Sequence, residues 1–168
     1  NNSPDFLNQI FENGTALCQA VVLNDINTVK HLLSFDGIDP NLYNDKNYTP
    51  LLLSFMNKNF ELIDLFLDYF GDNTHDIIWQ LNEGIKLILQ KPSLQGKNIL
   101  KRIAQINDVD VNIKINSRTI LTYAIENNEI DFVKILLQNK NLNPNIFIPS
   151  NGNTPLMFAI DNNCSIIA

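Results

Sequence analysis

The feature of this sequence that most constrains its fold is a motif that recurs every 34 or 35 residues. Each copy has a threonine, a leucine two residues later, and an alanine or serine five residues after the threonine. The threonines are Thr15, Thr49, Thr119 and Thr154, and the interval between the middle two is a double one of 70 residues. A fixed period in this range is typical of stacked repeat proteins. A divergent copy is therefore expected between Thr49 and Thr119.

Each copy predicts two short helices joined by a tight turn. The threonine hydroxyl can cap the first helix, and Pro50 and Pro155 stand where a helix needs no backbone N–H. Nine residues after each threonine comes Asn24, Lys58, Asn128 or Asn163, and asparagine tolerates the left-handed conformation that ends a helix. The second helices carry apolar residues on one face, at Val29-x-x-Leu32-Leu33, Ile63-x-x-Phe66-Leu67 and Val133-x-x-Leu136-Leu137. One repeat cannot bury such faces alone, so neighbouring repeats must cover them.

These residues resemble the ankyrin repeat family. The resemblance is carried by Thr49-Pro50-Leu51, Thr154-Pro155-Leu156, the leucine pairs at 32–33 and 136–137, and the turns at Asn41 and Asn145. It implies an all-α ankyrin-repeat solenoid of helix-turn-helix units with hairpin-like fingers, in about five repeats, the third degenerate and the last truncated. The family has a histidine after the motif's leucine, where this chain has Cys18, Leu52, Thr122 and Met157. The hydrogen bonds of that histidine must therefore be absent or replaced.

The repeats predict a single domain over residues 1–168. The apolar stripe of Phe6, Leu7, Ile10 and Phe11 predicts an N-terminal capping helix over 4–12, or alternatively the remnant of a preceding repeat. The repeats themselves are expected at about 13–46, 47–74, 75–113, 116–149 and 151–168.

The degenerate unit 75–113 leaves two alternatives. Its first helix is either one long helix or two short ones divided at Gly84, and Pro92 and Gly96 are expected to mark the loop that follows.

Composition narrows the classes of function. The net charge is −6 and only Arg102 and Arg118 are arginines, which disfavours a nucleic-acid interface. It also disfavours binding to anionic membranes. The apolar runs are too short to insert into a membrane. Cys18 and Cys164 fall in the first and last repeats, too far apart for a disulfide, which favours reduced thiols and a cytoplasmic location.

The sequence predicts no enzyme. His31 and His75 lie in different repeats, which disfavours a metal site. Gly96-Lys97-Asn98 lacks the first glycine and the Ser/Thr of a phosphate-binding loop. We therefore expect no catalytic residue, metal or cofactor.

The resemblance implies instead that a partner protein binds to finger tips and to the exposed face of first helices. The candidate binding residues are Tyr43, Lys46, Tyr48, Leu53, Lys114, Arg118, Tyr123, Ile146, Phe147 and Phe158. Aromatic residues and arginine are common anchors in protein interfaces. The alternative for Leu53, Tyr123 and Phe158 is that they pack against adjacent repeats.

The resemblance also suggests asparaginyl hydroxylation at the finger residues Asn41, Asn112 and Asn145. The alternative is that asparagine simply suits these turns.

The leading hypothesis for function is a protein-binding scaffold or adaptor whose partner is unidentified. One alternative is the recognition arm of a larger multidomain enzyme or effector. Another is a module that self-associates through the apolar edge of its last repeat.

Overall fold

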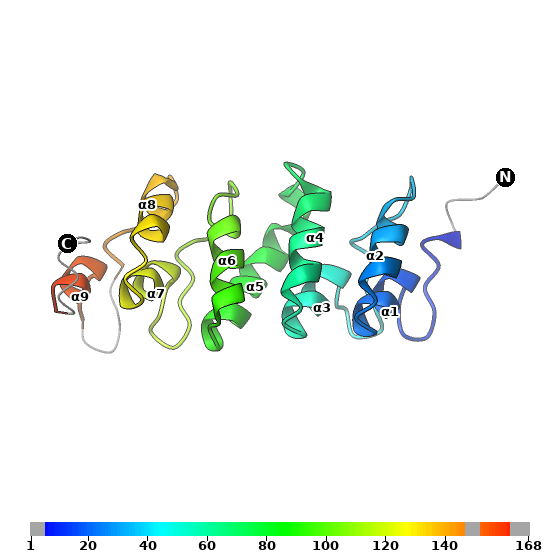
Figure 1. Ribbon diagram of the computed structural model, residues 1–168, viewed down its shortest axis with the longest axis horizontal. Coiled ribbons are helices and arrows are strands. Elements are labelled where there is room, and N and C mark those ends of the chain that lie inside the picture. Colours follow the sequence, from blue (N-terminus) through cyan, green and yellow to red (C-terminus); the bar gives the residue numbers. More distant parts are fainter. Residues whose placement is uncertain (1–5, 147–151, 162–168) are drawn as a thin grey trace. The chain divides into compact units, whose positions relative to one another are not determined.

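The computed structural model describes residues 6–146 and 152–161, and every regular element in these ranges is helical apart from two isolated β-bridges. The all-α prediction is confirmed. The helices are α1 (Ala16–Val22), α2 (Ile26–Leu33), α3 (Pro50–Met56), α4 (Phe60–Phe70), a short 3-10 helix (His75–Ile77), α5 (Ile78–Gln90), α6 (Leu94–Ile103), α7 (Ile120–Glu126), α8 (Ile130–Gln138) and α9 (Pro155–Asp161) (Figure 1).

The chain divides into two compact units, residues 1–80 (unit 1) and 81–168 (unit 2). The boundary between them falls within α5. Each unit contains helix pairs of the kind that the repeat predicts, and each is described separately below.

The repeated threonines cap the first helix of each pair. The hydroxyl oxygens of Thr15, Thr49 and Thr119 accept the backbone N–H groups three residues later. Thr154 accepts the N–H of Met157 in the same way. Each bond satisfies a backbone donor that the helix itself leaves without a partner. The predicted capping role of these threonines is confirmed.

The turn between the paired helices is left-handed, as the sequence predicts. Asn24, Lys58 and Asn128 have φ values of 58°, 55° and 54°. Asn163, the fourth residue of this set, lies outside the described residues. Because one left-handed residue reverses the chain, the second helix can begin two residues later and pack against the first.

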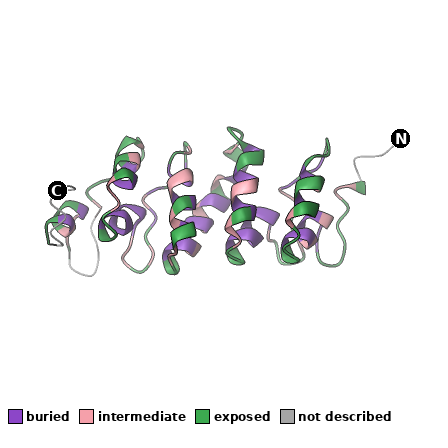
Figure 2. Ribbon diagram, in the orientation of Figure 1, coloured by how far each residue is buried: buried purple, intermediate pink, exposed green. Residues whose placement is uncertain are grey.

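In unit 1 the first helices form the interior and the second helices form the outer layer. Helix α1 packs on α2 and α3, and α3 packs on α4. Every residue of α3 from Pro50 to Phe55 is buried, whereas α4 buries one face made of Leu62, Ile63, Phe66, Leu67 and Phe70. Figure 2 shows this difference between α3 and α4. The buried apolar area of the two layers is the main stabilising term of the unit.

In unit 2 helix α7 plays the part of α3. Its residues Ile120 to Ile125 are all buried, and it packs on both α8 and α9. The matching positions of α8, at Phe132, Val133 and Leu136, are buried on one face only.

The degenerate repeat contains one long helix. Helix α5 runs without a break through Gly84, which is buried with Leu81, Ile85 and Ile88. Burial of this apolar face outweighs the cost of about 1 kcal/mol for a glycine in a helix. The expectation that Gly96 lies in a loop is wrong, because Ser93 caps α6 by accepting the N–H of Gly96.

The N-terminal capping helix predicted for 4–12 is not formed over residues 7–12, and residue 6 has 3-10 conformation. Phe6, Ile10 and Phe11 are 75%, 61% and 47% exposed, so no packing supports a helix that would be too short to form alone. The side chain of Asn8 instead donates to Gly37 O and accepts the N–H of Asp39, both at 2.8 Å.

Residues 8–14 have the geometry of a finger that recurs in unit 2. Asn112 donates to Asn141 O and accepts the N–H of Asn143, at the same sequence offsets as Asn8. The bridge between Phe11 and Gly14 likewise matches one between Ile115 and Arg118. We call this pair of side-chain bonds the asparagine clamp. This geometry favours the alternative that the segment is the remnant of a preceding repeat, which stays a prediction.

Other side chains replace the family's histidine in part. The Thr122 hydroxyl accepts the N–H of Thr119 at 2.8 Å and completes a capping box. The Cys18 thiol donates to Leu42 O at 3.7 Å. Leu52 is buried, and Met157 is 52% exposed. The side chain at the position of the family's histidine thus has different contacts in each of the four repeats.

Candidate functional site

The finger of unit 1, residues 39–48, is ordered by Asn44. Its Oδ1 accepts the backbone N–H groups of Lys46 and Tyr48 at 3.0 and 2.9 Å, and its own N–H donates to Tyr48 O. Tyr43 is 48% exposed, Lys46 is exposed and Tyr48 is half-buried. The turn therefore presents an aromatic ring and a cation from a fixed backbone.

The finger of unit 2, residues 110–118, is a tight hairpin. Ile115 and Arg118 exchange two backbone hydrogen bonds of 2.8 Å, and Asn116 and Ser117 between them have positive φ. Two central residues with positive φ match the right-handed twist of a hairpin. Lys114 is exposed. Arg118 is half-buried, and its Nε lies 2.9 Å from the Glu126 carboxylate.

Two candidate residues are not displayed at the surface. Leu53 and Tyr123, each four residues after a capping threonine, are both 7% exposed. A first helix contacts its own second helix and the next first helix, so this position retains almost no face toward solvent. The expectation of exposed side chains is wrong here, and the packing alternative describes both. Burial raises the pKa of the Tyr123 hydroxyl.

The remaining candidates lie near the end of the described chain. Ile146 and Phe158 are half-buried, and Phe158 has an interaction partner. Phe147 lies outside the described residues. The finger residues Tyr43, Lys46 and Lys114 are thus the candidates that combine exposure with a defined backbone, while Arg118 is half-buried and ion-paired.

The three finger asparagines have structural roles. The N–H groups of Asn41, Asn112 and Asn145 donate to the side chains two residues earlier, at 2.9 to 3.0 Å. Asn41 also accepts from Gln80 at 3.1 Å, while Asn112 makes the clamp. The side-chain bonds of Asn41 and Asn112 favour asparagine at those two turns. Hydroxylation stays a prediction.

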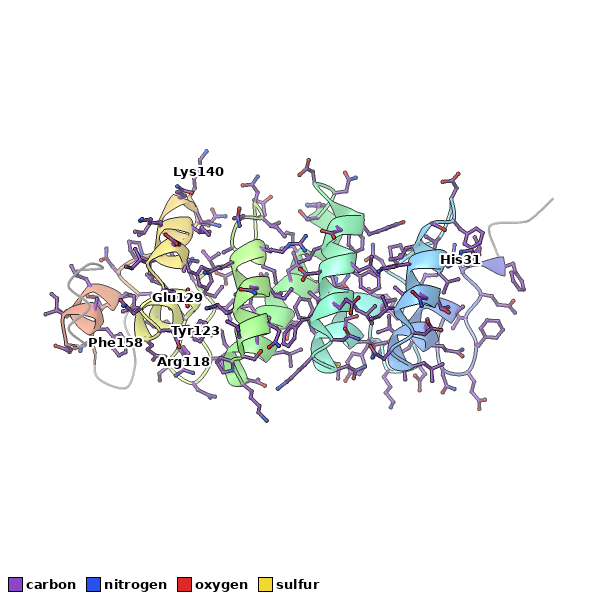
Figure 3. All side chains as sticks on the ribbon, in the orientation of Figure 1. His31, Arg118, Tyr123, Glu129, Lys140 and Phe158 are labelled. Atoms are coloured by element: carbon purple, nitrogen blue, oxygen red, sulfur yellow. The ribbon has the colours of Figure 1, made fainter. Side chains whose placement is uncertain are left out.

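A cluster of charged residues in unit 2 was not anticipated from the sequence. Glu129 forms ion pairs with Lys97 and with Lys101, the latter at 3.1 Å. Their hydrogen bonds, that of Lys97 first, hold the pKa of the Glu129 carboxyl below its usual range. Figure 3 shows Glu129 with Tyr123 and Arg118 in the α7–α8 repeat.

This cluster fastens α6 to the turn that precedes α8. The spacing of Lys97 and Lys101, one helical turn apart, was the available signal. Their shared partner, 28 residues after Lys101, could not be read from the sequence. Both lysines share the one carboxylate of Glu129, so the cluster acts as a structural link between α6 and the start of α8.

Nothing in the described ranges gathers three or more histidine, cysteine or acidic residues into a metal-ligand group. Within the same ranges, no helix has the length and apolarity needed to cross a membrane. Cys18 is a buried free cysteine, and burial raises the pKa of its thiol. The compartment of the protein stays a prediction.

A family model described as ankyrin repeats in three copies matches residues 83–168, slightly more than half of the chain. No curated protein matches the chain in a sequence search. The matched range begins in α5 and falls entirely in unit 2. Unit 1 lies outside it, but repeats the threonine caps, the left-handed turns and the asparagine clamp of unit 2.

Proposed function

Because the chain belongs to the ankyrin repeat family, whose members are generally protein–protein interaction modules, we propose that it is a scaffold or adaptor without catalytic activity. It binds a partner protein through its finger turns. The observation that carries this proposal is the exposure of Tyr43 and Lys46 on a turn that the hydrogen bonds of Asn44 hold in place.

The physical argument is preorganisation. A flexible loop must lose conformational entropy when it binds, whereas a turn already held in one conformation loses less. Tyrosine adds a large contact area with few rotatable bonds. In unit 2 the hairpin bond pair between Ile115 and Arg118 holds the finger that carries Lys114 in the same manner.

Site-specific crosslinking tests this proposal. A photoreactive amino acid is placed at Tyr43, at Lys114, or at His31, which is exposed on α2 as a control position. In a lysate of the parent organism, we expect the two finger positions to crosslink to the same partner and the control to give none. Crosslinking from His31 alone, or from none of the three, would contradict binding by the fingers.

A specific observation favours self-association as a second candidate. On α9, Leu156, Met157 and Ile160 are 52%, 52% and 59% exposed, and Leu156 lines a small apolar groove of about 210 Å³ between α7, α8 and α9. Static light scattering across a concentration series tests this candidate. A dimer that a Leu156→Glu substitution dissociates supports it, and a monomer at all concentrations overturns it.

A further inference from the structure

The acidic charge of this protein is concentrated in unit 1. Residues 1–80 contain eleven acidic residues and three lysines, a formal charge of −8, whereas residues 81–168 contain seven acidic and nine basic residues, a charge of +2. The three lysines of unit 1 can neutralise only three of its eleven negative charges. The unit therefore carries an excess negative potential that attracts cations.

Unit 1 also contains an open groove between its two helix turns. The groove has a volume of about 760 Å³ and lies between the α1–α2 turn and the α3–α4 turn. Its apolar lining residues are Val21, Val22, Ile26, Leu53 and Phe60. Asn24 and Asn59, which are joined by a side-chain hydrogen bond, also line it. Val22 is 58% exposed, whereas Val21 and Leu53 are 1% and 7% exposed, so Val22 supplies most of the apolar surface that the groove offers to a ligand.

The last residue of α1 and its counterparts in the other first helices show how the units differ. In unit 1 it is Val22 in α1 and Met56 in α3, which is 43% exposed. In unit 2 it is Glu126 in α7 and Asp161 in α9, and Glu126 is ion-paired with Arg118. The apolar wall is therefore a property of unit 1 and not of the repeat in general.

We infer that this groove binds a segment of a partner protein in which one apolar side chain is flanked by lysines or arginines. This inference rests on the proposed protein-binding function and adds the chemistry of the partner. The apolar side chain gains by leaving water. The groove's own lining carries one carboxylate, Glu61, and one cation, Lys58. The attraction for the flanking cations therefore comes from the net charge of −8 of unit 1 as a whole.

A second copy of this chain is a poorer occupant. The whole chain carries a charge of −6, so two copies repel each other. In unit 2, Lys86, Lys97, Lys101, Arg118 and Lys134 already have carboxylate partners within the unit. A partner segment that brings its own lysines or arginines can fill the apolar groove and also pair with the acidic residues of unit 1.

The test measures binding of fluorescent probe peptides by anisotropy. One short peptide has a single leucine between pairs of lysines; a second replaces the lysines by glutamate, and a third replaces the leucine by serine. We expect saturable binding of the first alone, weakened about tenfold or more when salt is raised from about 0.05 to 0.3 M, because exposed charges are then screened. No binding of the first peptide, or equal binding of the glutamate peptide, would overturn the inference.

A matched pair of variants locates the site. Val22→Asp and Leu23→Asp make the same charge change at adjacent exposed residues, 58% and 77% exposed, but only Val22 lines the groove. Although both add negative charge, we expect Val22→Asp to weaken binding about tenfold and Leu23→Asp to leave it within about twofold, since only the first loses apolar contact. Equal affinities of the two variants would overturn the site.

Sedimentation equilibrium tests whether a second copy of the chain occupies the groove. A dimer that Val22→Asp dissociates would mean that a second copy occupies the groove, and the inference would be wrong. If the probe peptide fails to bind while the finger crosslinks persist, the inference fails and the proposed function stands.

Discussion

Unit 1 and unit 2 have the same helical scaffold but differ in the number and placement of their charged residues. Leu51 and Leu121, at equivalent positions of α3 and α7, are 0% and 4% exposed. Both units use a threonine cap, a left-handed turn and an asparagine clamp. Yet unit 1 has a formal charge of −8 and unit 2 of +2.

The difference is clearest at one equivalent pair, Asn59 and Glu129, which precede α4 and α8. Asn59 accepts the N–H of Leu62 and so caps α4. Glu129 makes no such bond to α8 and instead forms ion pairs with Lys97 and Lys101. One unit satisfies its helix end locally, and the other uses the position to join two helix pairs. The comparison teaches that the repeat constrains the interior and the cap of each first helix, and leaves the residue that precedes the second helix free to diverge.

The largest loss of stability is expected when a buried leucine of a first helix is truncated, and it should be equal in the two units. Leu51→Ala and Leu121→Ala should each lower the free energy of unfolding of the affected unit by about 3 kcal/mol, because each removes a fully packed side chain and leaves a cavity. Urea denaturation followed by circular dichroism measures this loss. The same substitution at Leu137, which is 59% exposed, should change stability by about 0.5 kcal/mol or less. A small effect at Leu51 alone would break the equivalence of the two interiors.

The interior could be predicted from the sequence for this reason. The period of 34 or 35 residues, the threonine and the leucine are required by packing and capping, which act locally and recur in every copy. The left-handed turns at Asn24 and Asn128 followed from the preferences of one residue type. Even the long helix through Gly84 was among the alternatives, because its apolar spacing is continuous.

The surface could not be predicted in the same way. The burial of Leu53 and Tyr123 depends on neighbours from other repeats, which no local pattern encodes. The apolar stripe at Phe6, Leu7, Ile10 and Phe11 has helical spacing, yet residues 7–12 form no helix. Spacing alone does not reveal whether a partner surface exists. The Glu129 cluster joins residues about 30 positions apart, so only the structure brings them together.

A smaller loss of stability is expected when either asparagine clamp is removed. Asn8→Ala and Asn112→Ala each remove two hydrogen bonds to the following turn, and we expect each to cost about 1 kcal/mol. Hydrogen exchange should show faster exchange at the N–H of Asp39 in the first variant and of Asn143 in the second. Asn145, exposed at the equivalent finger position, is the control, and its replacement by alanine should cost less. Unchanged exchange at Asp39 would mean that residues 8–14 are not a finger equivalent to that of unit 2.

The smallest loss of stability is expected at Glu129 in unit 2, and it should depend on pH. The pKa of the Glu129 carboxyl lies below its usual 4.5 because Lys97 and Lys101 hydrogen-bond to the ionised form. Folding therefore favours the charged carboxylate, so its contribution is fully present above the unfolded pKa and is lost as pH falls through the folded pKa. At pH 7, Glu129→Gln should lower the free energy of unfolding by about 0.5 to 1 kcal/mol.

The matched variant in unit 1 is Asn59→Ala, which removes an uncharged cap at the equivalent position. Its cost should be about 1 kcal/mol and should stay constant through the acid range, because no proton is bound or released. The cost of Glu129→Gln should instead shrink toward zero below the folded pKa. Urea unfolding at pH 7 and at stepwise lower pH compares the two variants against the native chain. The two variants could instead lose the same free energy of unfolding at every pH. In that case the ion pairs of Glu129 would not stabilise the protein, and the two units would not differ at this position.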